Sequence, residues 1–169
     1  MIIKRMAPKG FSLIEMVVYI AILVLMLTVV IQVIFSVVRA NRVVQAGRNI
    51  ERSALSSLER MSREVHQAGT IDTSESVFGS ALGVLSLDGE DIDGNSRAVK
   101  FSLSSGQVRL LENGADVGAL SVASATVSSL IFTRFYGTST EGVRIQMTIE
   151  SGTSTAYRAE TFHTSALIR

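Results

Sequence analysis

Residues 9–38 read KGFSLIEMVVYIAILVLMLTVVIQVIFSVV, an almost unbroken apolar segment. Its last 23 residues, 16–38, are interrupted only by Thr28, Gln32 and Ser36. A helix of this length crosses the roughly 30 Å hydrocarbon core of a bilayer. The sequence therefore predicts a long helix whose first half is embedded in a membrane.

Glu15 directly precedes the apolar run 16–38 and is the only acid in residues 9–38. An ionised side chain at the edge of a bilayer is costly unless another group pairs with it. Glu15 is therefore the first candidate for a functional residue.

The residues around Glu15 resemble the processing site of type IV prepilins and of the pseudopilins of type II secretion. A short basic leader ends in Gly10, Phe11 follows it, and Glu15 is the fifth residue after Gly10. This resemblance covers roughly the first 30 residues. It implies that a membrane-embedded prepilin peptidase cleaves between Gly10 and Phe11 and that the new Phe11 amine is N-methylated. It also implies that Glu15 meets the Phe11 amine of a neighbouring subunit as a filament grows.

Physical chemistry gives these residues compatible roles. Gly10 has no side chain, so an extended backbone at Gly10 fits closely against a protease. Cleavage after Gly10 creates an α-amine that is mostly cationic at neutral pH. In low dielectric this cation attracts the Glu15 carboxylate strongly, and we expect the pairing to set the axial register of subunits.

Two other interpretations of the apolar segment remain open. A secretory signal peptide would offer Val38-Arg39-Ala40 as its cleavage site, but its apolar region usually spans about 7–15 residues. A plain single-span anchor explains the apolar run but gives no reason for Phe11 and Glu15.

Cations flank the apolar segment on both sides. Counted over the 15–20 residues nearest each end, they do not orient the helix, because three precede the run and four follow it. These cations are Lys4, Arg5 and Lys9, and Arg39, Arg42, Arg48 and Arg52. The resemblance, not the count, implies a cytoplasmic leader. The four arginines could meet lipid phosphates or DNA, but a solvated helix face is the simpler interpretation, and the net charge of +1 gives no case for nucleic acid.

The helix is predicted to continue from Ser12 to Ala68. Apolar and small residues recur there in alternating steps of three and four, which is one face of a helix. This stripe contains Val43, Gly47, Ile50, Ala54, Leu58, Met61 and Val65. Charged residues are expected mostly on the other sides, namely Arg48, Arg52, Glu59, Arg60, Arg63 and Glu64. Many pilins carry a proline about twenty residues into the mature helix, whereas here the only proline is Pro8.

Residues 69–97 read as a connecting region with one short strand, Ala81–Leu87. An acidic segment follows at residues 88–95, and its weak calcium candidates are Asp88, Asp91, Asp93 and Asn95. Oxygen ligands suit calcium, but Ser96 stands where an EF-hand loop needs glycine. A solvated turn between strands is the preferred interpretation.

From residue 98 onward, short apolar runs alternate with turn signals such as Ser105-Gly106 and Asn113-Gly114. The expected strands are 98–104, 107–112, 118–123, 126–136, 143–150 and 155–164. Tight turns between strands favour an antiparallel sheet, since parallel strands need long crossovers. The sequence thus predicts an α+β fold, pilin-like, in which a long N-terminal helix packs on a C-terminal antiparallel sheet. The expected domains are a leader, 1–10, a membrane or filament-core helix, 11–38, an amphipathic continuation, 39–69, and a globular domain, 70–169.

The chain offers little catalytic chemistry. It has no cysteine and only two histidines, His66 and His163, which we interpret as surface or packing residues. We therefore expect no catalytic residue, no cofactor and no metal beyond the weak calcium candidate.

The resemblance implies a non-enzymatic structural subunit, closer to a minor pseudopilin than to a major pilin, of a type IV pilus or a type II secretion filament. Its partners would be prepilin peptidase, other pilin or pseudopilin subunits, membrane lipid and assembly platform proteins. It would reside in the cytoplasmic membrane as a single-pass protein with an extracytoplasmic globular domain, and after assembly in the filament. The alternative is a membrane-tethered extracytoplasmic binding module with no filament role.

Overall fold

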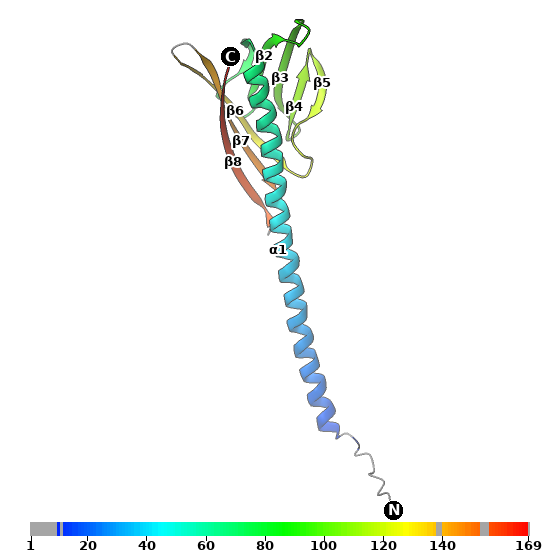
Figure 1. Ribbon diagram of the computed structural model, residues 1–169. Helices are drawn as coiled ribbons and strands as arrows, with labels where there is room; N and C mark the ends of the chain where they lie inside the picture. The colour runs from blue at the N-terminus through cyan, green and yellow to red at the C-terminus, as the bar shows by residue number, and fades with distance from the viewer. Residues whose placement is uncertain (1–9, 11, 138–139, 153–155, 169) are drawn as a thin grey trace, which may run out of the picture. The chain divides into compact units, whose positions relative to one another are not determined.

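The computed structural model describes residues 10, 12–137, 140–152 and 156–168. Contacts divide the chain into two compact units, residues 1–41 and 42–169. One helix, α1 (Leu13–Gln67), contributes to both units (Figure 1). Its bounds lie within one residue of the predicted Ser12–Ala68.

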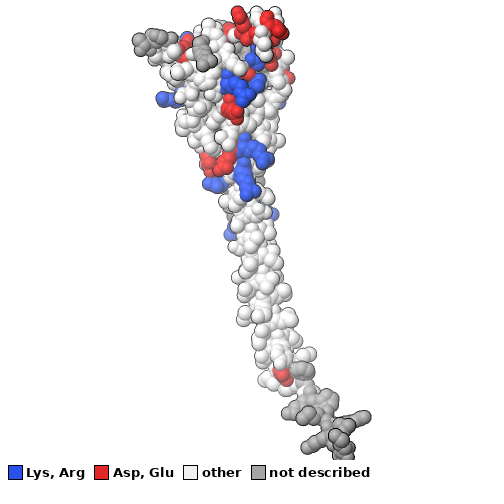
Figure 2. All heavy atoms as spheres, viewed as in Figure 1, with Lys and Arg blue, Asp and Glu red and all other residues white. Residues whose placement is uncertain are grey.

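In the first unit, α1 carries the apolar run and leaves its large side chains exposed. Leu23 and Phe35, for example, are 64% and 67% exposed. On the face that Figure 2 shows, no side chain of Lys, Arg, Asp or Glu appears along the apolar run beyond its beginning. Among the described residues, α1 is the one helix long and apolar enough to cross a membrane. So much exposed apolar surface is stable only in contact with lipid or with other apolar helices.

In the second unit, one face of α1 packs on the strands. The predicted stripe is confirmed, since Ile50, Ala54, Met61 and Val65 are fully buried. The same face also buries Glu64, which is only 3% exposed. The prediction that placed Glu64 on an outer side was therefore wrong. A carboxylate is buried here because the guanidinium groups of Arg60 and Arg97 pair with it.

Two antiparallel sheets cover this helix face, where one sheet was expected. The first sheet has the order β1-β2-β3-β4-β5 and the second the order β6-β7-β8. The strands of the first are β1 (Thr70–Val77), β2 (Val84–Glu90), β3 (Ser96–Ser104), β4 (Gln107–Glu112) and β5 (Ala115–Ala119). Those of the second are β6 (Thr126–Tyr136), β7 (Glu141–Ser151) and β8 (Arg158–Leu167). The α+β class with a long helix on antiparallel strands is confirmed.

The two sheets share one core with α1. Phe101 on β3 and Phe132 on β6 are its largest fully buried side chains. The backbones of the sheets also meet, because Val127 donates a 2.8 Å hydrogen bond to the Gly106 carbonyl. The helix and both sheets of this unit therefore form a single folded body, in which α1 runs roughly along the length of the strands (Figure 1).

Both predicted tight turns are present. Ser105 and Gly106 have φ angles of 52° and 72°, and Asn113 and Gly114 have 49° and 80°. Two consecutive residues at positive φ are characteristic of a type I′ turn, which matches the twist of the strands it joins. These turns set the registers of β3 with β4 and of β4 with β5.

Four strand predictions need correction. The strand expected at 81–87 is β2 and occupies residues 84–90, because residues 82 and 83 contact β6 instead, where the Gly83 amide donates a 2.8 Å hydrogen bond to the Leu130 carbonyl. Residues 70–77 form β1 although only Ile71 and Val77 are apolar there, because this edge strand faces solvent on most positions. β5 occupies residues 115–119, not 118–123, since the Asn113-Gly114 turn leads directly into it. β8 begins at Arg158 and ends at Leu167, whereas 155–164 was expected; Thr155 lies outside the described residues.

Candidate functional site

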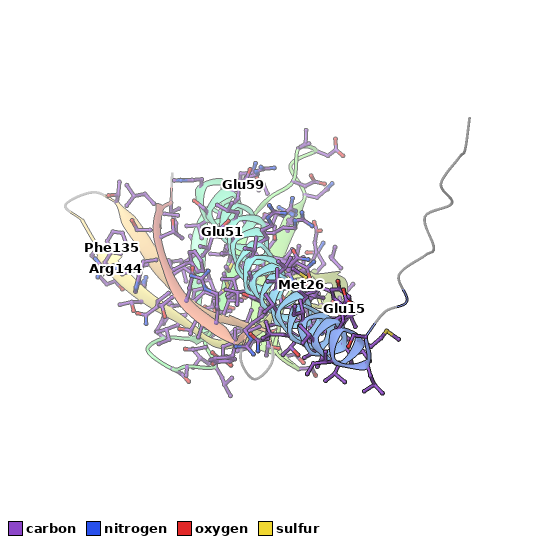
Figure 3. The ribbon with its side chains drawn as sticks, turned by 90° about the horizontal axis from the view of Figure 1, so that it is seen from below. Glu15, Met26, Glu51, Glu59, Phe135 and Arg144 are labelled. Carbon is purple, nitrogen blue, oxygen red and sulfur yellow. The ribbon has the colours of Figure 1, made fainter. Side chains whose placement is uncertain are left out.

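The candidate site lies where α1 begins. The first helical hydrogen bond runs from the Met16 amide to the Ser12 carbonyl at 3.2 Å. Glu15 therefore occupies the first turn, where unpaired backbone N–H groups favour a negative charge. Figure 3 shows Glu15 at this end of α1. The helix terminus thus contributes to holding a carboxylate next to an apolar run.

Tyr19 contacts Glu15 one turn further along. Its hydroxyl donates a 3.0 Å hydrogen bond to Glu15 Oε1. Charged hydrogen bonds of this kind are stronger than neutral ones. The bond satisfies one carboxylate oxygen and favours one orientation of the carboxylate. The sequence interpretation missed Tyr19, although its i, i+4 spacing from Glu15 was a sufficient signal.

The predicted cleavage site is only partly described. Gly10 is exposed, and a Cβ atom added to it would meet no atom within 4 Å. This backbone is open to a protease. Phe11 and leader residues 1–9 lie outside the described residues, so the predicted pairing of Phe11 with Glu15 of another subunit stays a prediction.

The polar residues within the apolar run are arranged to limit their cost in lipid. The Thr28 hydroxyl donates a 2.8 Å hydrogen bond to the Val24 carbonyl. Gln32 and Ser36 follow at intervals of four residues, which places all three on neighbouring positions of one helix face. Such residues remain compatible with a membrane-spanning helix.

The acidic segment does not assemble the calcium candidates. Asp88 belongs to β2, while Asp91, Asp93 and Asn95 belong to the β2–β3 turn. Within the described residues, no group of three or more His, Asp or Glu side chains is placed to hold a metal ion. The Asp91 amide donates to the Asn95 carbonyl at 2.8 Å, as in a tight turn. The geometry supports the preferred interpretation of a turn.

The two histidines lie near each other in the fold. Both line a groove of about 980 Å³ between α1 and β8, together with the apolar side chains of Leu55, Leu58 and Phe162. The Nδ1 atom of His66 lies 2.8 Å from the Leu167 carbonyl oxygen, so Nδ1 carries the proton in this contact. This hydrogen bond joins α1 to the end of β8. His66 thus has a packing role, as predicted.

Comparison with known proteins gives one match. The model of the prokaryotic N-terminal methylation motif matches residues 5–31. This motif is the prepilin leader typical of type IV pilins and pseudopilins, and it confirms the resemblance at the N-terminus. No curated protein and no solved structure matches the chain.

Proposed function

We propose that this protein is a non-enzymatic structural subunit, a minor pilin or pseudopilin, of a type IV pilus or a type II secretion filament. The observation that carries the proposal is Glu15. It is the one acid in residues 9–38, which include the exposed apolar run of α1, it lies in the first helical turn, and it falls within the matched prepilin leader motif. A structural anchor alone has no need for an acid at this costly position.

In this proposal, assembly has two driving forces. Prepilin peptidase cleaves between Gly10 and Phe11, and the resulting Phe11 amine is N-methylated but remains cationic. The Glu15 carboxylate of one subunit pairs with that amine on the next subunit. The exposed apolar side chains of residues 16–38 exchange lipid for neighbouring helices, where close packing and polar contacts hold them together.

The proposal also assigns the location. Before assembly the subunit resides in the cytoplasmic membrane. Residues 16–38 lie in the bilayer, and the two β-sheets lie outside the cytoplasm. Assembly platform proteins then transfer it into the filament. The prepilin leader motif and the apolar first half of α1 support this arrangement.

Mass spectrometry of the N-terminus tests processing directly. The protein isolated from a host with prepilin peptidase should begin at a methylated Phe11. Gly10→Val should retain the leader, because a branched side chain at this position blocks close approach of the protease. Ser12→Ala is the matched control and should still be cleaved. An intact Met1 in the functional protein contradicts the proposal.

Assembly needs a separate test. Glu15→Ala should be cleaved and methylated normally but should be largely absent from filaments. Incorporation of Glu15→Ala at the normal level would show that Glu15 has no role in subunit pairing.

A membrane-tethered binding module is the second candidate function. The observation that favours it is the groove between α1 and β8, which is lined in part by the apolar side chains of Leu55, Leu58 and Phe162. A binding module keeps residues 1–10 and does not co-assemble with pilins, so the N-terminal mass distinguishes the two functions.

A further inference from the structure

The groove between α1 and β8 lies wholly within the second unit, and large apolar side chains that line it stay in contact with solvent. Leu55 is 70% exposed, and Leu58 and Phe162 are only partly buried. Apolar side chains that are exposed together mark a contact site, whereas solitary ones do not. The groove therefore offers room and apolar surface to a side chain of a partner.

Positive charge adjoins the groove along the same face of α1. Leu55 and Glu59 also line a second depression, of about 500 Å³, together with Arg48 and Arg52. Steps of four, three and four residues place these side chains in one row on the helix. Among the described residues, no carboxylate oxygen lies within 4.0 Å of the side-chain nitrogens of Arg48 or Arg52. Both arginines are thus available to an acidic partner.

The acids of this face leave part of the positive charge uncompensated. Glu59 is already paired with Arg63 at 2.8 Å. Among the described residues that line the groove or the second depression, the other acid is Glu51, which like Glu59 projects from α1 (Figure 3). Three arginines and two glutamates give 3 − 2 = +1 for this face. A negatively charged segment with an exposed apolar side chain therefore fits it best.

The turn between β2 and β3 has this complementary chemistry. Ile92 is 102% exposed, more than any other large apolar side chain of the described residues. Residues 86–96 contain four acids and no lysine or arginine. None of these carboxylates has a Lys or Arg nitrogen within 4.0 Å in the described part of the chain. The acids are Asp88, Glu90, Asp91 and Asp93.

The chain's own cations next to this turn have other partners. Arg60 and Arg63 line a shallow depression with Ile92, but they pair with Glu64 and Glu59 of α1. The complete exposure of Ile92 means that no side chain of the same copy covers it. The turn is therefore free to meet another molecule.

We propose that the groove of one copy receives the β2–β3 turn of a second copy. Ile92 of the second copy packs on the apolar side chains of the groove, and the acids beside it face Arg48 and Arg52. The contact is heterologous because it joins two different surfaces, so each copy keeps one free groove or turn and the contact repeats along a row of subunits. The proposal rests on the proposed function and deepens it, since it names a contact between neighbouring subunits of the filament.

The two parts of the contact have different effects. Insertion of Ile92 removes apolar surface of both copies from water, which favours association. Opposite charges around an apolar contact mainly determine which partner binds and in which orientation. Because these charges lie at an exposed rim, salt weakens their attraction. The contact should therefore lose selectivity in about 1 M NaCl.

Disulfide cross-linking tests the contact, because the native chain contains no cysteine. Full-length chains with Leu55→Cys, the groove chain, and with Ile92→Cys, the turn chain, are produced together in a host that has prepilin peptidase and the filament machinery. Each chain carries one cysteine, so any disulfide joins two copies. A disulfide forms only where two Cα atoms come within about 7 Å. Mass spectrometry should show the 55–92 linked peptide at least several-fold above the 55–55 and 92–92 products.

Val117→Cys is the matched control for the groove chain. Val117 is also apolar and 59% exposed, but it lies on β5 of the first sheet. A chain with Val117→Cys should give little product with the turn chain. A 55–92 yield no higher than the 117–92 yield overturns the proposal.

Exchange of the charges tests the complementarity. R48D/R52D in the groove chain and E90R/D93R in the turn chain should each lower the 55–92 yield several-fold, and the two changed chains together should restore most of it. All four side chains are exposed, and circular dichroism checks that each variant is folded. Asp91 is left unchanged, because it accepts a 2.6 Å hydrogen bond from the next amide of the turn. An exchanged pair that does not restore the yield overturns the proposal.

Two further readings separate other outcomes. A groove chain that cross-links only to a different protein of the filament overturns the proposal in favour of another partner. The N-terminal mass of the same preparation reports on processing. A methylated Phe11 terminus without the 55–92 product leaves the proposed function intact and refutes the groove contact alone, whereas an intact Met1 overturns both.

Discussion

Arg97 on β3 donates two hydrogen bonds to the Glu64 carboxylate of α1. Its Nη1 atom donates to Oε2 at 2.7 Å and its Nη2 atom donates to Oε1 at 3.2 Å. Arg60 approaches the same carboxylate from α1, with its Nη2 atom 2.7 Å from Oε1. Arg97 also bonds to Glu112 on β4 through Nε. Hydrogen bonding to Glu64 and then to Glu112 raises the pKa of Arg97 above its ordinary value.

The Glu64–Arg97 pair explains how the helix is held on the first sheet. Burial of a carboxylate is unfavourable unless paired groups replace water, and here two guanidinium groups do so. Two parallel hydrogen bonds restrict how the guanidinium group and the carboxylate can be oriented. The pair therefore favours one position of the helix relative to β3 and β4. Truncation of either partner removes part of this compensation, because Glu64 then keeps only Arg60 and Arg97 keeps only Glu112.

We predict that Arg97→Ala destabilises the protein by about 3–5 kcal/mol, because it leaves the Glu64 charge buried beside Arg60 alone. Denaturant unfolding of the full chain in detergent, followed by near-ultraviolet circular dichroism, measures the change. Arg109→Ala is the control, since Arg109 forms an exposed pair with Asp116 and should cost at most about 1 kcal/mol. Equal effects of the two variants would show that the Glu64 pair adds no more to stability than an exposed pair.

Removal of the Tyr19 hydroxyl should weaken assembly without affecting processing. Tyr19→Phe leaves Glu15 without its 3.0 Å hydrogen bond, and the carboxylate loses a fixed orientation. A charged hydrogen bond of this type contributes about 1.5–3 kcal/mol. We therefore expect the amount of this subunit in sheared filaments to fall at least several-fold while N-terminal cleavage stays complete. Tyr136→Phe, on β6, is the control and should assemble normally.

The parts of the fold that depend on periodicity were predictable from sequence. The α1 stripe repeats at helical spacing, and β4 and β6 have the predicted bounds because turns and apolar alternation delimit them. The burial of Glu64 was not predictable, since its partner Arg97 is 33 residues away and comes close only when the sheet forms. The separation into two sheets likewise depends on tertiary packing, which local patterns do not encode.

The candidate site was likewise predictable only where a local sequence pattern defines it. The positions of Gly10, Phe11 and Glu15 follow from a linear motif, and the family model matches the same segment. The Tyr19 contact needed the helix geometry as well as the motif. The calcium candidates were grouped by sequence proximity alone, and the structure distributes them between β2 and the following turn.

The Asp72 carboxyl should titrate below its ordinary pKa of 3.8. Ser74 lowers the pKa of Asp72, because its hydroxyl and amide donate hydrogen bonds of 2.6 and 2.8 Å to Oδ1. The folded state therefore favours the ionised form. This contribution to stability is complete above the unfolded pKa and is lost as the pH falls through the lower folded value. Carbon-detected NMR titration measures the pKa, and Ser74→Ala should raise it toward 3.8. An unchanged pKa in Ser74→Ala would assign the shift to another cause.

Gly142 should resist even the smallest substitution. Gly142 belongs to β7 and lies opposite Phe135 of β6 and Leu167 of β8. A Cβ atom at Gly142 would lie 2.5 Å from Phe135 Cζ and 2.8 Å from the Ala166 carbonyl oxygen. Both neighbours must shift to admit it, and one of them is backbone.

We expect Gly142→Ala to destabilise the protein by about 1–3 kcal/mol, the usual cost of overpacking. Gly89→Ala is the matched control, because Gly89 also lies in a strand but its added Cβ atom would meet nothing closer than 3.4 Å. The two variants are compared by denaturant unfolding and by amide exchange of β7 and β8. If Gly142→Ala is no less stable than Gly89→Ala, the second sheet has more room beside Phe135 than the structure shows, and the tight approach of β6, β7 and β8 at this end is refuted.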